Sequence, residues 1–191
     1  QVAFLEEHPS IYLISCHAQN FGESDLVNRI RGNSEVLRCR MLIRPVFAHP
    51  GFMMRRELIE EGFFYDETFR TAQDYEFAVR AAGTHEIGMV PEILLHYRVH
   101  KKQISNTANG NQVTNADRVR QKQLEQLKIT LSGEEQQVYH DWVYERKPQS
   151  FEEFVEASAL LQRFVTANEK TGIYDGRVLE KTLKRLLYTW V

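Results

Sequence analysis

The chain has 191 residues and a formal net charge of −2, with 42% hydrophobic and 26% charged residues. This is the composition of an ordinary globular protein that is long enough to bury a sizeable core, and its near-neutral charge argues against a nucleic-acid partner. No apolar run approaches the roughly 18 residues that a membrane span needs, and no signal-peptide pattern is present. We therefore expect a cytoplasmic protein.

The first segment opens on Gln1 and is typical of the end of a helix already under way, so we interpret it as a truncated or processed end. Residues 10–17 are rich in β-branched and aromatic residues after a proline, which predicts a buried strand. The polar residues 20–33 predict a loop. Cys16 and Cys39 show neither paired nor metal-binding spacing, which favours reduced, buried thiols.

A basic segment follows, in which seven arginines between Arg29 and Arg56 accompany a single acid, Glu35. Such a segment could face phosphate groups. The alternative is a solvated surface whose arginines pair with acids elsewhere, and this interpretation is favoured for most of the seven.

The middle of the chain alternates between strand and helix patterns. Residues 47–54 predict a second strand, and residues 55–61 a helix that stops at Gly62. A further helix begins at Asp74 and ends at Gly83, with an apolar face formed by Tyr75, Ala78, Val79 and Ala82. Residues 87–99 predict strands that break near Pro91. This alternation indicates an α/β layered core.

The character changes after Ser105. Residues 106–115 are small, polar and without periodicity, which predicts a linker or mobile loop. Helix patterns then cover 117–131, 132–144 and the segments that begin at Ser150 and Asp175, with Ser150 and Glu153 forming a capping box. We expect these helices to pack against one another rather than extend the sheet.

Asp74 is the first candidate for chemistry. A carboxylate at a helix N-terminus is stabilised in its ionised form by the helix dipole and could act as a general base. Aspartate is also a preferred N-cap whether or not chemistry takes place there, so both interpretations remain open from the helix pattern alone.

Four segments form a combination that extends this argument: His-Pro-Gly-Phe-Met-Met-Arg-Arg at 49–56, Gly-Phe-Phe-Tyr-Asp-Glu at 62–67, Ala-Gln-Asp-Tyr-Glu-Phe-Ala-Val-Arg at 72–80 and Tyr-Arg-Val-His at 97–100. Together they resemble the acceptor-side half of the family 2 glycosyltransferases, which have the nucleotide-sugar-binding GT-A fold. The resemblance implies that Asp74 is the catalytic base. Gln73 stands where the family has a glutamate, and we expect it to contact substrate.

The resemblance also implies roles for residues outside that helix. Arg98, His100 and Lys101 would contact the donor diphosphate, with His100 a possible ligand of its metal, and His49 would line the acceptor pocket. A divalent ion, Mg²⁺ or Mn²⁺, is implied for the full-length enzyme. The family's Asp-x-Asp motif, which binds nucleotide and metal, does not occur in these 191 residues, so we expect the donor-binding half to be missing.

The sequence therefore predicts an α/β fold: a partial GT-A layered domain over residues 1–112 and a helical extension over residues 113–191. The expected function is that of the C-terminal part of an inverting glycosyltransferase. Its parent would move a sugar from a nucleotide-sugar donor to a saccharide or lipid-linked acceptor in cell-surface polysaccharide synthesis, in the cytoplasm or at the inner membrane face.

An alternative from another class is a non-catalytic protein-interaction module that uses the C-terminal helices. Exposed Trp142, Phe151, Phe154 and Trp190 would support it, although such residues more often form the core of a helical bundle.

Overall fold

The computed structural model describes residues 1–100, 109–143, 148 and 150–190. The chain divides into two compact units, one made of Gln1–Arg38 and Pro45–Val119, the other of Cys39–Arg44 and Arg120–Val191. The first unit holds a four-stranded mixed sheet with helices, so the α/β class is confirmed. This unit continues to Val119, whereas the sequence pattern predicted a boundary at residue 112. The second unit also includes residues 39–44, from an earlier part of the chain.

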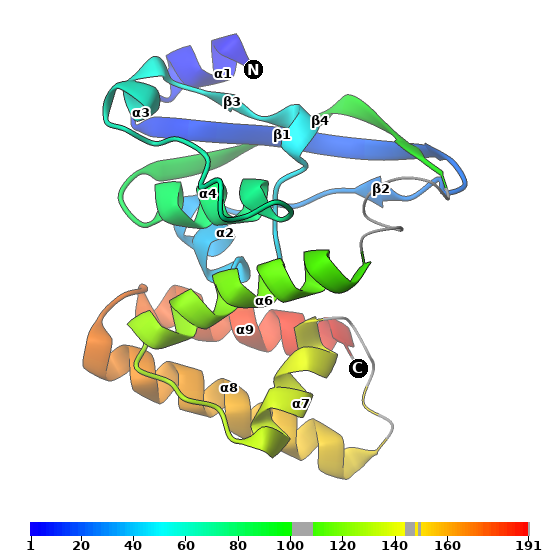
Figure 1. Ribbon diagram of the computed structural model, residues 1–191, viewed down its shortest axis with the longest axis vertical. Coiled ribbons are helices and arrows are strands. Elements are labelled where there is room, and N and C mark those ends of the chain that lie inside the picture. The colour runs from blue at the N-terminus through cyan, green and yellow to red at the C-terminus, as the bar shows by residue number, and fades with distance from the viewer. Residues whose placement is uncertain (101–108, 144–147, 149, 191) are drawn as a thin grey trace. The chain divides into compact units, whose positions relative to one another are not determined.

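The sheet is built around β1 (Ile11–Gly22), which runs parallel to β4 (Glu86–Val99) along its whole length (Figure 1). The short strands β2 (Val27–Asn28) and β3 (Met53–Met54) pair antiparallel with β1. The strand expected at residues 10–17 is confirmed. It extends further, through the first residues of the expected loop at 20–33.

The strand β4 is continuous, whereas the sequence predicted a break near Pro91. The pairing register with β1 shifts between Val90 and Leu95, as Cys16 pairs with Val90, His17 with Ile93 and Ala18 with Leu95. Proline has no N–H to donate to a sheet and is accommodated at bulges. The irregularity that the sequence indicated is therefore a bulge within one strand.

The strand expected over residues 47–54 is wrong for most of its length, because only Met53 and Met54 pair with β1. His49–Gly51 forms a 3-10 turn, η1, with Pro50 in its first turn. Ser15 Oγ donates a hydrogen bond to the Ala48 carbonyl at 3.2 Å. A Cβ on Gly51 would lie 2.8 Å from that same Oγ, so η1 packs directly on β1 and only glycine fits there.

Helices flank the sheet. They include α1 (Val2–Glu7), α2 (Ser34–Arg40) and α3 (Arg56–Glu60). The last of these confirms the helix expected before Gly62.

The helix α4 (Gln73–Ala82) carries the candidate base. It begins one residue earlier than the pattern predicted: its N-cap is Ala72, and Asp74 occupies the second helical position. Tyr75, Ala78 and Ala82 are buried as expected, and Val79 is half-buried. The end at Gly83 is confirmed.

The described part of residues 117–191 contains no strand and is helical, as expected. It comprises most of α6 (Asn109–Gln126) and all of α7 (Gly133–Val143), α8 (Phe151–Thr171) and α9 (Gly176–Trp190). The linker expected at 106–115 is wrong from Asn109 onward, where α6 begins. None of the described helices is long and apolar enough to cross a bilayer.

Three of these helices, α7, α8 and α9, begin with a side-chain cap, of which the sequence analysis named the capping box at Ser150. The Ser132 backbone N–H donates to Glu135 Oε2 at 2.8 Å, and the Glu135 N–H donates to Ser132 Oγ at 3.2 Å. Ser150 Oγ accepts from the Glu153 N–H at 3.2 Å. Asp175 Oδ1 accepts from the Val178 N–H at 2.9 Å. Each cap satisfies a backbone donor that the helix itself leaves unpaired.

The core of the second unit includes Trp142, Phe164, Leu179 and Leu183, all fully buried. Phe154 is half-buried against this cluster, and the side chain of Trp190 lies outside the described part of the chain. Of the residues offered for an interaction surface, Phe151 is the exposed one, at 81%. The aromatic residues thus mainly build the helical core.

Candidate functional site

A pocket of about 580 Å³ lies entirely within the first unit. Its wall is formed by the carboxyl-terminal part of β1 with the β2 hairpin, the segment before and within η1, the start of α4 and the end of β4. The lining residues are Ala18, Asn20, Ser24, Leu26, Val27, Asn28, Phe47, Ala48, His49, Pro50, Asp74, Tyr97 and Val99. Two of the sequence-predicted site residues, Asp74 and His49, are brought together here.

Asp74 is presented at the start of α4 by an unusual backbone. Ala72 has φ 58° and ψ 20°, in the left-handed region that residues other than glycine rarely adopt. Asp74 Oδ1 accepts a hydrogen bond from the Tyr75 N–H at 2.9 Å. Such backbone strain persists where the surrounding structure holds it, and it concentrates at functional sites.

The first-unit part of α6 supplies contacts that hold this turn. Asn115 Nδ2 donates to Thr71 Oγ1 at 2.9 Å. Arg118 donates to the Thr68 carbonyl at 3.3 Å, and its guanidinium lies 4.3 Å from the centre of the Phe69 ring. Residues expected in or beside a linker therefore fix the loop that precedes the candidate base.

His49 is oriented by Tyr65. The imidazole Nε2 lies 2.9 Å from the Tyr65 hydroxyl, and the two rings meet edge to face at 5.7 Å. Burial raises the pKa of Tyr65, and the negative charge of Asp74 raises it further. Because the phenol stays protonated, its hydroxyl is able to donate a hydrogen bond to Nε2.

Tyr65 is tied to α4 through its neighbours. Its ring packs against Phe77 at 5.0 Å, and Arg80 Nη2 donates to the Phe64 carbonyl at 2.7 Å. The same guanidinium is held by the buried carboxylate of Glu76, with both N–O distances at 3.0 Å. This ion pair raises the pKa of Arg80, and the arrangement fixes residues 64–65 to the helix that carries Asp74.

The β1–β2 hairpin supplies another part of the pocket lining, which includes the polar side chains of Asn20, Ser24 and Asn28. The Asn20 N–H donates to the Leu26 carbonyl at 2.9 Å, and Asn20 Nδ2 donates to Ser24 Oγ at 3.4 Å. Gly22 has φ +94°, and a Cβ there would lie 2.6 Å from the Val99 carbonyl oxygen. Glycine is required at this turn, which closes the hairpin over the end of β4.

The remaining predicted residues lie apart from the pocket lining. Tyr97 and Val99 line it, and alternation along β4 places Arg98 on the opposite face of the sheet. Arg98 and His100 are exposed, and Gln73 is half-buried at the first position of α4. Lys101 lies outside the described residues.

The pocket lining offers one carboxylate and one imidazole. Across residues 1–100, 109–143, 148 and 150–190 no three His, Cys, Asp or Glu side chains gather to hold a metal ion. These side chains do not by themselves form a divalent-metal site, and we derive no chemical step through a metal.

Comparison of this chain with protein-family models, with curated proteins and with solved structures finds no significant match. The pocket and the sequence motifs are therefore the features of this chain that point to a function.

Several pocket residues were not predicted as site residues. Asn20, Ser24 and Asn28 lie in the segment expected to be a loop, and Tyr65 acts through its contact with His49. The face on which Tyr97 lies could have been predicted. Side chains alternate along a strand, so Tyr97 and Arg98 must lie on opposite faces of the sheet.

Proposed function

We propose that this chain is the acceptor-side part of an inverting glycosyltransferase, with Asp74 as the general base. The observation that carries the proposal is the shared pocket, which is lined by both Asp74 and His49 together with Asn20, Ser24 and Asn28. The sequence motifs suggest the reaction class, and the pocket is where we propose that an acceptor binds.

The reaction requires the protein to position the substrates and to accept the proton of the acceptor hydroxyl. The acceptor hydroxyl oxygen attacks the anomeric carbon of the donor as the bond to the diphosphate breaks, and Asp74 takes the hydroxyl proton. The electron pair of the broken bond leaves with the diphosphate. Attack opposite the leaving group inverts the anomeric configuration.

The pocket suits a sugar acceptor. Its volume of about 580 Å³ lies within the range of small-ligand sites, which is roughly 300–1,000 Å³. Asn20, Asn28 and Ser24 offer donors and acceptors to sugar hydroxyls, and the aromatic rings of Phe47 and Tyr97 offer flat apolar surface. His49 would position the acceptor, because Tyr65 fixes its ring.

The donor side requires residues beyond these. Nucleotide and divalent metal would be bound by a part of the enzyme that carries the Asp-x-Asp motif, which the 191 residues lack. Arg98, His100 and Lys101 remain predictions for the donor diphosphate, and Gln73 for substrate contact. The parent enzyme would act on a saccharide or lipid-linked acceptor, in the cytoplasm or at the inner face of the membrane.

The test is to express the full-length gene product and to screen nucleotide sugars with Mg²⁺ or Mn²⁺ for hydrolysis and for transfer. We expect turnover with a nucleotide sugar, and loss of that turnover in D74N. Absence of any hydrolysis or transfer across the donor panel would overturn the proposal.

A second measurement uses the 191-residue chain alone. Because the nucleotide and metal pockets belong to the other half, calorimetry with a nucleoside diphosphate and Mn²⁺ should detect no binding tighter than about millimolar, roughly −4 kcal/mol. A micromolar dissociation constant would show that the donor site lies within this chain.

A further inference from the structure

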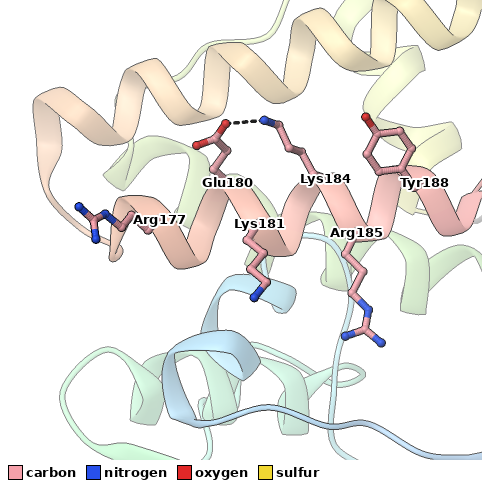
Figure 2. A pocket seen from close by; sticks show the side chains of 6 residues that line it. All are labelled: Arg177, Glu180, Lys181, Lys184, Arg185 and Tyr188. Atoms are coloured by element: carbon pink, nitrogen blue, oxygen red, sulfur yellow. Dashed lines mark hydrogen bonds and ion pairs between the residues drawn. The ribbon is translucent and has the colours of Figure 1, made fainter.

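A row of basic side chains follows one side of α9. Arg177, Lys181 and Arg185 are spaced by four residues and are exposed, so they lie along one stripe of the helix surface. Figure 2 shows Lys181 and Arg185 extending from the same side of α9, with Glu180, Lys184 and Tyr188 on the other. All six border a shallow pocket of about 600 Å³.

The charge of this pocket is strongly positive. Glu180 is the single acid in its lining, and its carboxylate already pairs with Lys184 at 2.6 Å. Arg177, Lys181 and Arg185 are therefore left without an acid in the lining. A concave surface with three such cations attracts anions.

Arg40 adds a partly buried guanidinium from another segment of the same unit. Its Nε is buried and has no hydrogen-bond partner in the described structure. Burial lowers the pKa of Arg40, and the positive charge of Arg185 lowers it further, with no acid acting in the other direction. The guanidinium groups of Arg40 and Arg185 thus repel each other.

This arrangement is unfavourable in the free protein. A partly buried charge loses hydration, and a like charge nearby adds Coulomb repulsion that water screens incompletely. A dianion bound at the α9 pocket beside Arg185 would offset this repulsion. The planar fork of arginine is well matched to phosphate oxygens.

We propose that Arg177, Lys181 and Arg185 form a binding site for a phosphate-type anion, a phosphate or diphosphate group, at the α9 pocket, with Arg40 adding positive charge to the same unit. It is a second site, built from other residues than the Asp74 pocket, and it does not depend on the glycosyl-transfer proposal. The group could belong to a free diphosphate or to a phospholipid head group, since both present the same oxygens.

The test measures thermal unfolding of the 191-residue chain with inorganic pyrophosphate and with NaCl at equal ionic strength. Pyrophosphate should raise the unfolding midpoint in a saturable way, because a ligand that binds only the folded state stabilises it, whereas NaCl should give a smaller, non-saturating change. The increase should be strongly reduced in R185Q and weakened in R40Q. Without pyrophosphate, R40Q should unfold at the same or a higher temperature than the parent chain, because a repulsive charge is gone.

K170Q is the matched control, since it removes an exposed cation from the same unit outside this pocket. It should keep the full response. R185Q changes an exposed position, so it tests the site even if R40Q fails to fold. Its affinity for pyrophosphate should fall about tenfold or more. An equal response to NaCl and pyrophosphate, or an equal loss in K170Q and R185Q, would overturn the proposal.

A vesicle assay separates the two sources of phosphate. The chain is sedimented with phosphatidylcholine vesicles that contain phosphatidylglycerol. Binding that is reduced in R185Q and competed by pyrophosphate would identify a lipid head group. A response to pyrophosphate with no vesicle binding would identify a soluble ligand. Failure of both assays would refute the site.

Discussion

The hydroxyl of Tyr65 lies 2.9 Å from the imidazole Nε2 of His49, and this contact joins the segment that precedes α4 to η1, which lines the candidate acceptor pocket. The same phenol experiences the negative charge of Asp74. Tyr65 lies outside the pocket lining, yet it interacts with both His49 and Asp74, which line the cavity.

The coupling gives a pH-dependent prediction. Burial and Asp74 both raise the pKa of Tyr65 above its ordinary value of 10.0, since both disfavour the phenolate. We expect D74N to lower this pKa toward the ordinary value, though burial keeps part of the increase. Absorbance of tyrosinate during alkaline titration, with Y65F to assign the signal, measures it. An unchanged titration in D74N would contradict the coupling.

The proposed general base gives a kinetic prediction. In the full-length enzyme, D74N should lower turnover by about 10²-fold or more, the usual scale for loss of a general base, with little change in donor binding. E67Q is the matched control, because it makes the same acid-to-amide change at an exposed position outside the pocket lining. Near-normal turnover in D74N would refute the assignment of Asp74.

The left-handed turn before α4 gives a stability prediction. Ala72 has φ 58°, a conformation that costs a residue with a Cβ roughly 1 kcal/mol and that glycine adopts freely. A72G should therefore change the free energy of unfolding by less than about 0.5 kcal/mol, as relief of strain offsets the added freedom of the unfolded chain.

The comparison variant is A81G, at a fully buried position inside α4. It should destabilise the chain by about 1 kcal/mol or more. Denaturant unfolding of both variants checks the difference. If A72G costs as much as A81G, the turn is not strained.

The ion pair at the start of α7 predicts acid sensitivity. A hydrogen bond from Arg163 lowers the pKa of Glu135, and the Ser132 N–H contributes further. The stability from this group is therefore complete above the ordinary pKa of 4.5 and is lost as the pH falls through the lower folded-state value. E135Q should be less stable than the parent chain at neutral pH, and the gap should close below that pH.

Thermal unfolding across a pH series measures this gap. E134Q, one residue away at an exposed position, should show a smaller difference at neutral pH. A gap for E135Q that stays constant down to the lowest pH would contradict the role of the ion pair.

The cysteines give a chemical prediction. Cys16 is 5% exposed and Cys39 0%, neither is part of a disulfide, and burial raises the pKa of the Cys16 thiol. Neither should react with an aromatic disulfide reagent at neutral pH until the chain is denatured, because the thiolate is the reactive form. Rapid labelling of the native chain would show that a thiol is accessible.

The sequence alone predicted the elements whose signals are local. Helices were predicted to start at Ser132, Ser150 and Asp175, and each of these side chains bonds to a backbone group three residues away, so a short pattern contains the information for the helix start. The same holds for the end of α4 at Gly83 and for the burial of Tyr75 and Ala78. The strand at residues 10–17 was detectable because its side chains are buried on both faces.

Tertiary structure decided the features that depend on distant partners. Asn109–Asn115 has a poor helix-forming composition, yet it is helical where Asn115 contacts Thr71. Residues 47–52 are apolar, but Pro50 and the packing of Gly51 on Ser15 exclude a strand.

The candidate site shows the same division. Asp74 and His49 were named from their motifs, whereas Asn20, Asn28 and Tyr65 join them only because the chain folds back on itself. The pairing register of β1 with β4 sets Tyr97 opposite Asn20 and Arg98 opposite Phe21, and it therefore decides which face Arg98 occupies. A local pattern specifies a helix or a strand, but contacts between residues tens of positions apart are fixed by the packing of the whole unit.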